Sequence, residues 1–176
     1  MESVALPLPE VNDQQLWQLI CRGEEIGLRL EMTHVGITWE TMPGLRHQEL
    51  LASIFSSIQP HVSADDGCEC YRAIDVPIRF PDGTAKIPDI SVFCSRPEED
   101  EGFVRMVPET VIEITSPGYE DKDLVTGPAI YLANGVQDVV VLDRRVSVVH
   151  HWTSEGHVTA PSPVTLKLAC GCLVLV

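Results

Sequence analysis

Two carboxylates lie inside otherwise apolar runs of the sequence. Asp89 is the acid of Ile-Pro-Asp-Ile-Ser-Val, residues 87–92, and Glu113 is the acid of Val-Ile-Glu-Ile-Thr, residues 111–115. An acid inside an apolar strand is desolvated, and two ionised acids in contact repel each other, so such a pair needs a cation. If the two strands are neighbours, the carboxylates meet and predict a site for a divalent metal.

Oxygen ligands and several waters form the incomplete octahedron that Mg²⁺ prefers, with open positions for a phosphate oxygen and an attacking water. The implied chemistry is hydrolysis of a phosphodiester. The alternative is structural: Asp89 follows a proline and bonds a neighbouring amide, while Glu113 faces solvent from an edge strand. Asp89 alone fits this alternative better, but the pair, with Ser116-Pro117 directly after the second strand, favours a site.

The elements that must position these acids follow from the pattern of apolar residues and turn signals. We expect a first helix from Asn12 or Asp13 to about Arg22 and a longer helix between Pro43-Gly44 and Pro60. We expect hairpins over 28–33 with 36–41, and over 71–80 with 85–94 across the turn Pro-Asp-Gly. A strand follows at 109–115, then a helix from Pro128 to the stop at Asn134-Gly135, and further strands from 138 to the end. This order predicts one α/β (α+β) domain over residues 1–176, a mixed sheet flanked by helices.

The composition limits the function. The formal net charge of −14 over 176 residues argues against a metal-free protein that coats nucleic acid, but not against a nuclease, because a metal site is itself acidic. Arg144-Arg145 indicate that the few bases could gather on one face. No apolar run approaches the roughly 20 residues of a membrane span. The first residues, MESVALPLPE, do not fit a secretory signal, so we expect a cytoplasmic protein.

Four of the six cysteines form two Cys-x-Cys pairs, Cys68 with Cys70 and Cys170 with Cys172. Four thiolates could hold a structural zinc, although zinc ligands usually have two or more residues between them. The alternative, which we favour, is that the first pair lies in a turn and the second alternates across a terminal strand. The placement of all six favours reduced thiols.

Three segments carry a resemblance to one nuclease family. They read IPDISVF at 87–93, PETVIEITSPGYEDKDL at 108–124 and IYLANGVQDVVVLD at 130–143. The sequence resembles the Uma-two family of restriction endonucleases, within the PD-(D/E)XK nuclease-like superfamily. The residues that match the family pattern are Pro88, Asp89, Ser91, Glu113, Ser116, Pro117, Asp123, Tyr131, Gly135, Val136 and Asp143.

The resemblance implies a restriction-endonuclease-like core and cleavage of DNA with Mg²⁺ or Mn²⁺. It makes Asp89 and Glu113 the metal ligands, with a backbone carbonyl near Ile114 as a third. Glu31 would complete the acidic pocket, although taken alone it is as well read as an outward strand residue. Such nucleases usually cut duplexes as homodimers, for which the apolar segment 170–176 could provide an edge.

The departures from the pattern concern a lysine. The superfamily lysine two residues after the glutamate is replaced by Thr115, and the position that Uma-type proteins use on the next helix is Gly127. The nearest substitute is Lys122, whose flexible stem could carry an ammonium back to the site. The alternative, which we favour for Lys122 taken alone, is a solvated loop lysine paired with its acidic neighbours at 120, 121 or 123. His47 is read as a helix-start residue rather than a base.

The missing lysine leaves a second hypothesis open, from a different class of function. A catalytically inactive protein that keeps the nuclease fold would act as a binding or assembly module, and the −14 charge is compatible with that role.

Overall fold

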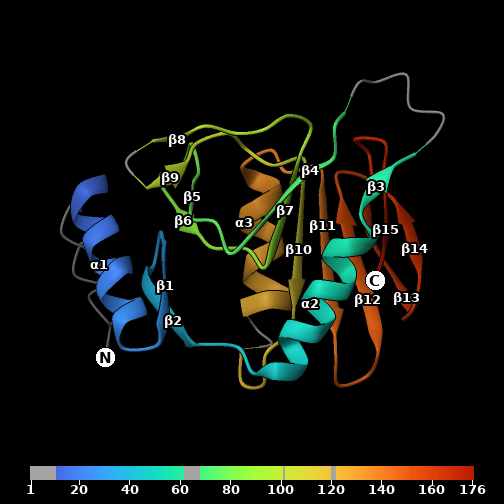
Figure 1. Ribbon diagram of the computed structural model, residues 1–176, viewed down its shortest axis with the longest axis horizontal. Coiled ribbons are helices and arrows are strands. Elements are labelled where there is room, and N and C mark those ends of the chain that lie inside the picture. Colours follow the sequence, from blue (N-terminus) through green and yellow to red (C-terminus); the bar gives the residue numbers. More distant parts are fainter. Residues whose placement is uncertain (1–10, 62–67, 101, 120–121) are drawn as a thin grey trace, which may run out of the picture.

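The computed structural model describes residues 11–61, 68–100, 102–119 and 122–176. Within these residues the chain forms three sheets with helices packed against them (Figure 1). The mixed α/β class that the order of elements predicts is therefore confirmed. No helix in the described part of the chain is long and apolar enough to cross a lipid bilayer.

The central sheet carries both strands in which the sequence places an acid. Its strand order is β13-β12-β11-β10-β7-β4. The strands are β4 (Tyr71–Ile74), β7 (Ile90–Phe93), β10 (Thr110–Ile114), β11 (Asp138–Asp143), β12 (Val148–Thr153) and β13 (Gly156–Pro161). β10 runs parallel to β11 and antiparallel to β7, with Ile112 opposite Ile90. The Glu113 strand and the Asp89 segment are therefore neighbours.

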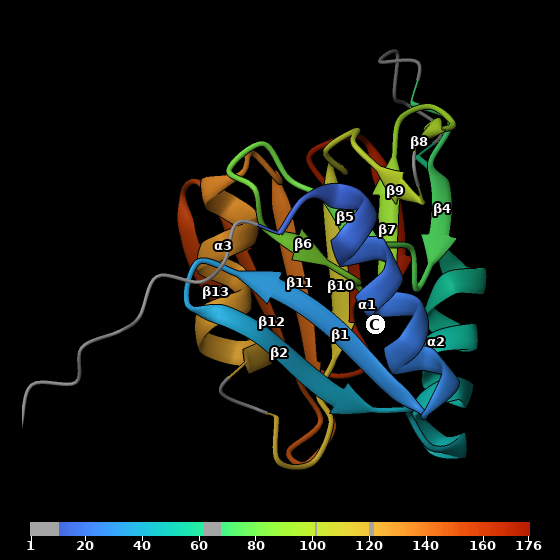
Figure 2. The same ribbon diagram turned by 90° about the vertical axis from the view of Figure 1, so that its left-hand side faces the viewer.

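Helices flank the central strands β10 and β11, which explains why these strands are continuously apolar (Figure 2). Ile112 and Leu142 belong to the core on the side of α2 (Leu45–Ser57). Val111 and Val141 belong to the core on the side of α3 (Gly127–Ala133), where Tyr131 packs. Because side chains alternate along a strand, Glu113 shares the α3 face with Val111.

The second sheet has the order β2-β1-β6-β5-β9-β8. Its strands are β1 (Leu28–Thr33), β2 (Gly36–Thr41), β5 (Ile78–Arg79), β6 (Ala85–Lys86), β8 (Glu99–Asp100) and β9 (Phe103–Val104). The predicted hairpin over β1 and β2 is present and lies across the front of the central sheet in Figure 2, with α1 (Asp13–Glu25) packed on β1 through Leu16 and Ile20.

The hairpin expected over 71–80 and 85–94 is present but divided between the two sheets. Tyr71 lies opposite Phe93 in the central sheet, and Ile78 lies opposite Lys86 in the second sheet. Both pairs have the register of a single hairpin. Prolines at 77 and 88 interrupt the arms, because proline has no N–H to give to the ladder. Asp89 comes directly after this interruption, so it sits where the two sheets separate.

The helices begin and end close to the predicted positions. Asn12 caps α1 in a capping box with Gln15, and the helix continues three residues beyond the expected Arg22. The structure adds elements that the sequence did not predict: the short strands β3 (Gln59–Pro60), β8 and β9, and a π-helix η1 (Lys122–Thr126) directly before α3. Pro128 stands in the first turn of α3, where a missing N–H is tolerated, as the sequence predicts.

The C-terminal segment forms a small sheet of order β14-β15-β3, from β14 (Thr165–Lys167), β15 (Cys172–Leu175) and β3 (Gln59–Pro60). β15 is paired on both sides, so the expectation that segment 170–176 offers a free edge for a dimer is wrong. Cys170 lies in the turn before β15 rather than in an alternating strand.

The cysteines also differ from expectation. The structure joins Cys68 to Cys94 and Cys70 to Cys172 as disulfides, whereas the sequence favours reduced thiols.

Candidate active site

Asp89 and Glu113 are joined by reciprocal contacts between side chain and backbone. The Asp89 N–H donates to Glu113 Oε2 at 3.0 Å, and the Ile114 N–H donates to Asp89 Oδ2 at 2.8 Å. Both residues are buried, with 3% and 7% of their surface exposed. The alternative in which Glu113 faces solvent from an edge strand is therefore wrong. The two acids meet at the C-terminal end of β10, where Ile114 is the last residue.

The two carboxylates have different partners. Asp89 Oδ1 accepts from Arg29 Nη1 at 3.1 Å and lies 3.2 Å from His47 Nε2. Glu113 Oε1 accepts from the Tyr131 hydroxyl at 2.6 Å. Among the described residues, the Arg29 guanidinium forms an ion pair with Asp89, but no lysine or arginine forms one with Glu113.

This difference sets opposite pKa shifts. Burial and the neighbouring Asp89 charge raise the pKa of Glu113 well above its ordinary value. Burial also acts against ionisation of Asp89, but His47 and Arg29 outweigh it and lower the pKa of Asp89. If both acids were ionised, the pair would carry more negative charge than Arg29 neutralises, so a bound cation would let Glu113 ionise.

Glu31 lies on the buried face of β1, so the reading of it as an outward strand residue is wrong. Its Oε2 is 2.5 Å from Lys86 Nζ and 3.0 Å from Lys122 Nζ, and its Oε1 accepts from the Ile87 N–H at 3.0 Å. Burial opposes its ionisation, but the two ammonium groups outweigh burial and hold the pKa of Glu31 to about 2. Glu31 is thus a permanent anion that anchors two lysines.

Lys122 reaches from the start of η1 back to the acidic cluster. In addition to Glu31, its Nζ lies 3.2 Å from Glu40 Oε1, and its side chain is only 19% exposed. Burial opposes its charge, but Glu31 and Glu40 outweigh burial and raise its pKa. Residues 120 and 121, its alternative sequence neighbours, lie outside the described part of the chain. The ammonium group is therefore inside the site rather than in a solvated loop.

Gly127 explains why the lysine comes from position 122. A Cβ atom at Gly127 would lie 2.9 Å from the Lys122 carbonyl oxygen, which is closer than real Cβ contacts. The backbone of η1 therefore leaves no room for a side chain at 127. The same turn places Lys122 where its side chain enters the cluster.

Further residues belong to the site and were not assigned a role from the sequence, among them Arg29, Glu40, Lys86 and Tyr131. Arg29 also forms ion pairs with Glu40, its cross-strand neighbour, and with Asp75. The sequence offers one signal for Arg29, the alternation of leucine and charged residues in Leu-Arg-Leu-Glu, residues 28–31. In the structure the charged positions of this strand are buried and the leucines are half-buried. An alternating strand does not by itself tell which face is inward.

Two openings flank the acidic cluster. A cavity of about 770 Å³ is lined by Lys86 and Lys122 together with apolar side chains such as Trp39 and Ile130. A cleft of about 370 Å³ is lined by Arg46, His47, Ser116 and Arg144, and Tyr119 borders both openings. The cluster is thus buried but approached from two sides, one of which carries arginines.

Comparison with known families agrees with this arrangement. The model of the Uma2 family, described as "Putative restriction endonuclease", matches residues 13–168. The chain belongs to the Uma2 family. The resemblance drawn from the segments around Asp89 and Glu113 is confirmed.

A solved structure supports the fold of this Uma2 member. The chain is similar to the crystal structure of a "putative nuclease belonging to DUF820" from Anabaena variabilis, with a TM-score of 0.61 and 21% sequence identity over 81% of this chain and 83% of that chain. A likeness at this identity concerns the fold, which is restriction-endonuclease-like as expected. No relative was found among curated proteins.

Proposed function

We propose that this protein is a divalent-metal-dependent endonuclease that hydrolyses phosphodiester bonds of DNA. Asp89 and Glu113 would hold Mg²⁺ or Mn²⁺, with the Ile114 carbonyl as a third ligand. The observation that carries the proposal is that two buried acids are joined by reciprocal hydrogen bonds between side chain and backbone, and that one of them, Glu113, has no ion-pair partner among the described residues. Membership of the Uma2 family supports the reaction class.

The donor set fits a hard divalent cation. Within the described part of the chain, Asp89 Oδ2 and both oxygens of Glu113 accept hydrogen bonds from neutral N–H or O–H donors, so each keeps a lone pair for a metal. All the donors are oxygens, which Mg²⁺ and Mn²⁺ prefer. When bound, the metal supplies Lewis-acid polarisation of the phosphate and lowers the pKa of a bound water.

Lys122, held by Glu31 together with Lys86, would supply the positive charge that other PD-(D/E)XK nucleases obtain from the lysine of their motif. Lys122 borders the large cavity and is partly accessible, so its ammonium can meet negative charge that develops on a phosphate. Glu31 positions this ammonium together with that of Lys86. The same contacts are compatible with the alternative hypothesis of an inactive protein, because the ammonium groups of Lys86 and Lys122 are already paired with acids.

DNA would approach over the cleft that holds arginines. Arg46 and Arg144 come from α2 and from the turn after β11, and they line one cleft beside His47. Arginine binds phosphate oxygens through a planar fork of donors. A local basic cleft reconciles DNA binding with the net charge of −14.

A homodimer remains part of the proposal, with a different edge from the one first expected. β2 is the end strand of the second sheet, and its residues Ile37 and Trp39 are exposed beside the exposed Val35. An exposed edge strand with apolar side chains is suited to pairing with a second copy. Sedimentation of wild type and Trp39→Glu at equal concentration tests this: a monomeric wild type contradicts the dimer.

Plasmid cleavage tests the function. Wild type with Mg²⁺ or Mn²⁺ should nick or linearise supercoiled DNA, and EDTA, Asp89→Asn and Glu113→Gln should each abolish cleavage. Glu24→Gln, at an exposed position of α1, is the matched control and should cleave like wild type. Cleavage that survives Glu113→Gln contradicts the site. No metal binding by calorimetry and no cleavage by wild type would favour the inactive scaffold.

A further inference from the structure

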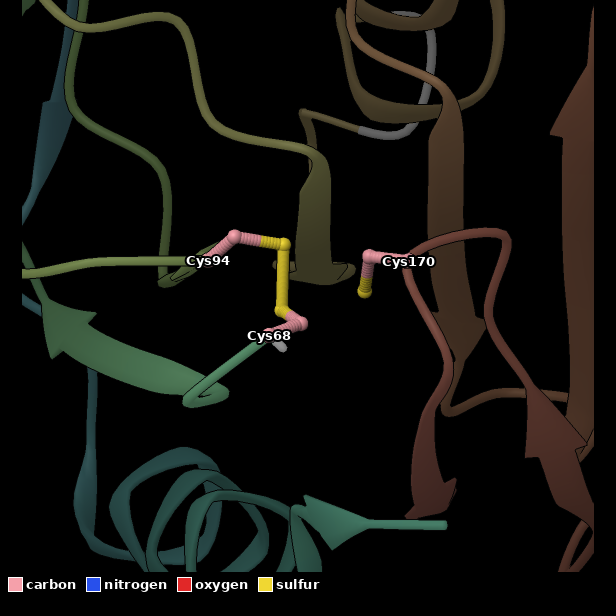
Figure 3. A group of neighbouring side chains, drawn as sticks. All are labelled: Cys68, Cys94 and Cys170. Atoms are coloured by element: carbon pink, nitrogen blue, oxygen red, sulfur yellow. A yellow bond between two sulfur atoms is a disulfide. The ribbon is translucent and has the colours of Figure 1, made fainter. Parts of the chain in front are cut away.

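Five of the six cysteines lie close together in the fold, although they come from distant parts of the sequence. Cys68 and Cys70 precede β4, Cys94 follows β7, and Cys170 and Cys172 lie at the start of the β15 hairpin strand. The Sγ atoms of Cys68, Cys70 and Cys172 lie within 4.8 Å of one another, and so do those of Cys68, Cys94 and Cys170. Figure 3 shows the second group, with Cys170 pointing toward the sulfurs of Cys68 and Cys94.

This convergence removes the sequence argument against a metal. Short Cys-x-Cys spacing is unfavourable when one loop must wrap an ion, but here the sulfurs come from three separate segments. The cluster is also largely closed to solvent, since Cys70 is 2% exposed and Cys172 is fully buried. Closed, four-sulfur sites are typical of structural zinc.

We propose that the reduced form of this cluster binds one Zn²⁺ through Cys68, Cys70, Cys94 and Cys172. The Sγ atoms of Cys68 and Cys172 lie 3.7 Å apart without a bond between them. Zn–S bonds of about 2.3 Å in a tetrahedron give a sulfur–sulfur edge of about 3.8 Å, which this distance matches. The other two sulfurs are each already next to one of these, Cys94 to Cys68 and Cys70 to Cys172.

Zinc binding requires reduction of the two disulfides that the structure contains. A thiol reductant gives two electrons and two protons to each disulfide, and is itself oxidised to a disulfide, which yields four cysteine thiols. These thiols release four protons as they bind Zn²⁺, because thiolate is the ligand form. A reducing cytoplasm would maintain the thiol state. The cluster thus has two exclusive states, two disulfides or one tetrathiolate zinc site.

The site would be structural and separate from the proposed nuclease metal. Cys94 follows the C-terminal end of β7, whereas Asp89 precedes its N-terminal end, and all the zinc ligands are sulfur. Zinc would tie the segment before β4 to β7 and to the C-terminal hairpin. If the protein does not bind zinc at this cluster, the proposal of a nuclease metal site at Asp89 and Glu113 is unaffected.

Metal content of the full chain tests the proposal. Protein expressed with added zinc and purified with a phosphine reductant, which is not a zinc-binding thiol, should contain one equivalent of zinc by mass spectrometry. Cys68→Ser should lose the zinc. Cys21→Ser, outside the cluster, is the matched control and should retain it. Cys170→Ser should also retain it, because Cys170 is not one of the four proposed ligands, although its Sγ lies within 4.8 Å of those of Cys68 and Cys94. Loss of zinc in Cys170→Ser would overturn the assignment of the four ligands.

Cobalt provides a readout that does not depend on any variant folding. Reduced wild type titrated with Co²⁺ should develop thiolate-to-cobalt charge-transfer absorption and the intense visible bands of a tetrahedral site, saturating at one equivalent. Zinc should then displace the cobalt. Reduced, folded wild type that takes up neither metal while all of its thiols react with a thiol reagent would overturn the proposal.

Discussion

Lys86 and Glu31 form a buried ion pair, with 2.5 Å between Nζ and Oε2 and 2% of each side chain exposed. Lys122 binds the same oxygen but keeps 19% of its side chain exposed at the edge of a cavity. One carboxylate therefore holds two ammonium groups in unequal environments. We infer that the buried lysine serves stability and the accessible one serves chemistry.

Lys86→Met should destabilise the protein. The substitution keeps the length of the chain but leaves Glu31 with only the more exposed Lys122, and removal of one partner of a buried pair typically costs about 3–5 kcal/mol. Urea unfolding measures the loss. Lys167→Met, an exposed lysine on β14, is the matched control and should change stability by less than about 0.5 kcal/mol. Equal effects of the two variants would contradict the structural role of Lys86.

Lys122→Met should have the opposite profile. Because Glu31 keeps Lys86, the fold should be retained, while cleavage should fall about a hundred- to a thousandfold through lost stabilisation of the transition state. Plasmid cleavage and urea unfolding on the same preparation separate the two effects. Unchanged cleavage in a folded Lys122→Met protein would show that this lysine takes no part in the reaction.

Tyr131→Phe should weaken metal binding. The phenylalanine keeps the ring that packs against Phe80 but removes the 2.6 Å hydrogen bond to Glu113 Oε1. Loss of a hydrogen bond that orients a metal ligand typically costs about ten- to a hundredfold in metal affinity. Mn²⁺ titration by calorimetry measures this, with Tyr71→Phe on β4 as the control that should bind like wild type. Equal Mn²⁺ affinities for wild type, Tyr131→Phe and Tyr71→Phe would contradict the assignment of Glu113 as a metal ligand.

The sequence was sufficient to predict the strand that carries Glu113 and the strand that directly follows Asp89, because an acid within an apolar run stands out. That the two strands are neighbours was a condition that the structure supplies. The sequence also predicted α2 and the end of α3, where Pro43-Gly44 and Asn134-Gly135 are strong local signals. These features depend on short stretches of chain.

The remaining parts of the site depend on tertiary context. The inward face of β1, with Arg29 and Glu31, is set by the partners that meet it, and an alternating pattern reads equally well in either direction. Lys86 lies in a two-residue strand beside a proline-broken hairpin, for which no periodicity exists to read. The cysteine cluster joins segments about a hundred residues apart, so spacing could not reveal it.

The stability of the metal-free protein should depend on pH through Asp123. Burial, with the carboxylates of Glu40 and Asp89, raises the pKa of Asp123 to about 7, although Lys122 opposes this. The folded protein therefore keeps a proton that the unfolded chain, with a pKa of about 3.9, has lost. The contribution of this group to the free energy of unfolding is largest below pH about 4 and falls as pH rises toward about 7.

Asp123→Asn isolates this contribution, because asparagine does not titrate. The free energy of unfolding of wild type minus that of Asp123→Asn should decrease from pH about 4 to about 7, measured by urea unfolding in EDTA. A difference that stays constant from pH about 4 to about 7 would mean that Asp123 is ionised in the folded protein over this range.

Gly127 provides the sharpest test of how the site obtains its lysine. In an unobstructed helix, glycine to alanine stabilises by about 1 kcal/mol, but a Cβ here would overlap the Lys122 carbonyl oxygen at 2.9 Å. Gly127→Ala should therefore destabilise by about 1–3 kcal/mol. Gly127→Lys should lower cleavage because the same overlap displaces the turn that directs Lys122 toward Glu31. Increased cleavage by Gly127→Lys would instead show that a lysine at position 127 serves the site and that Lys122 does not supply its charge.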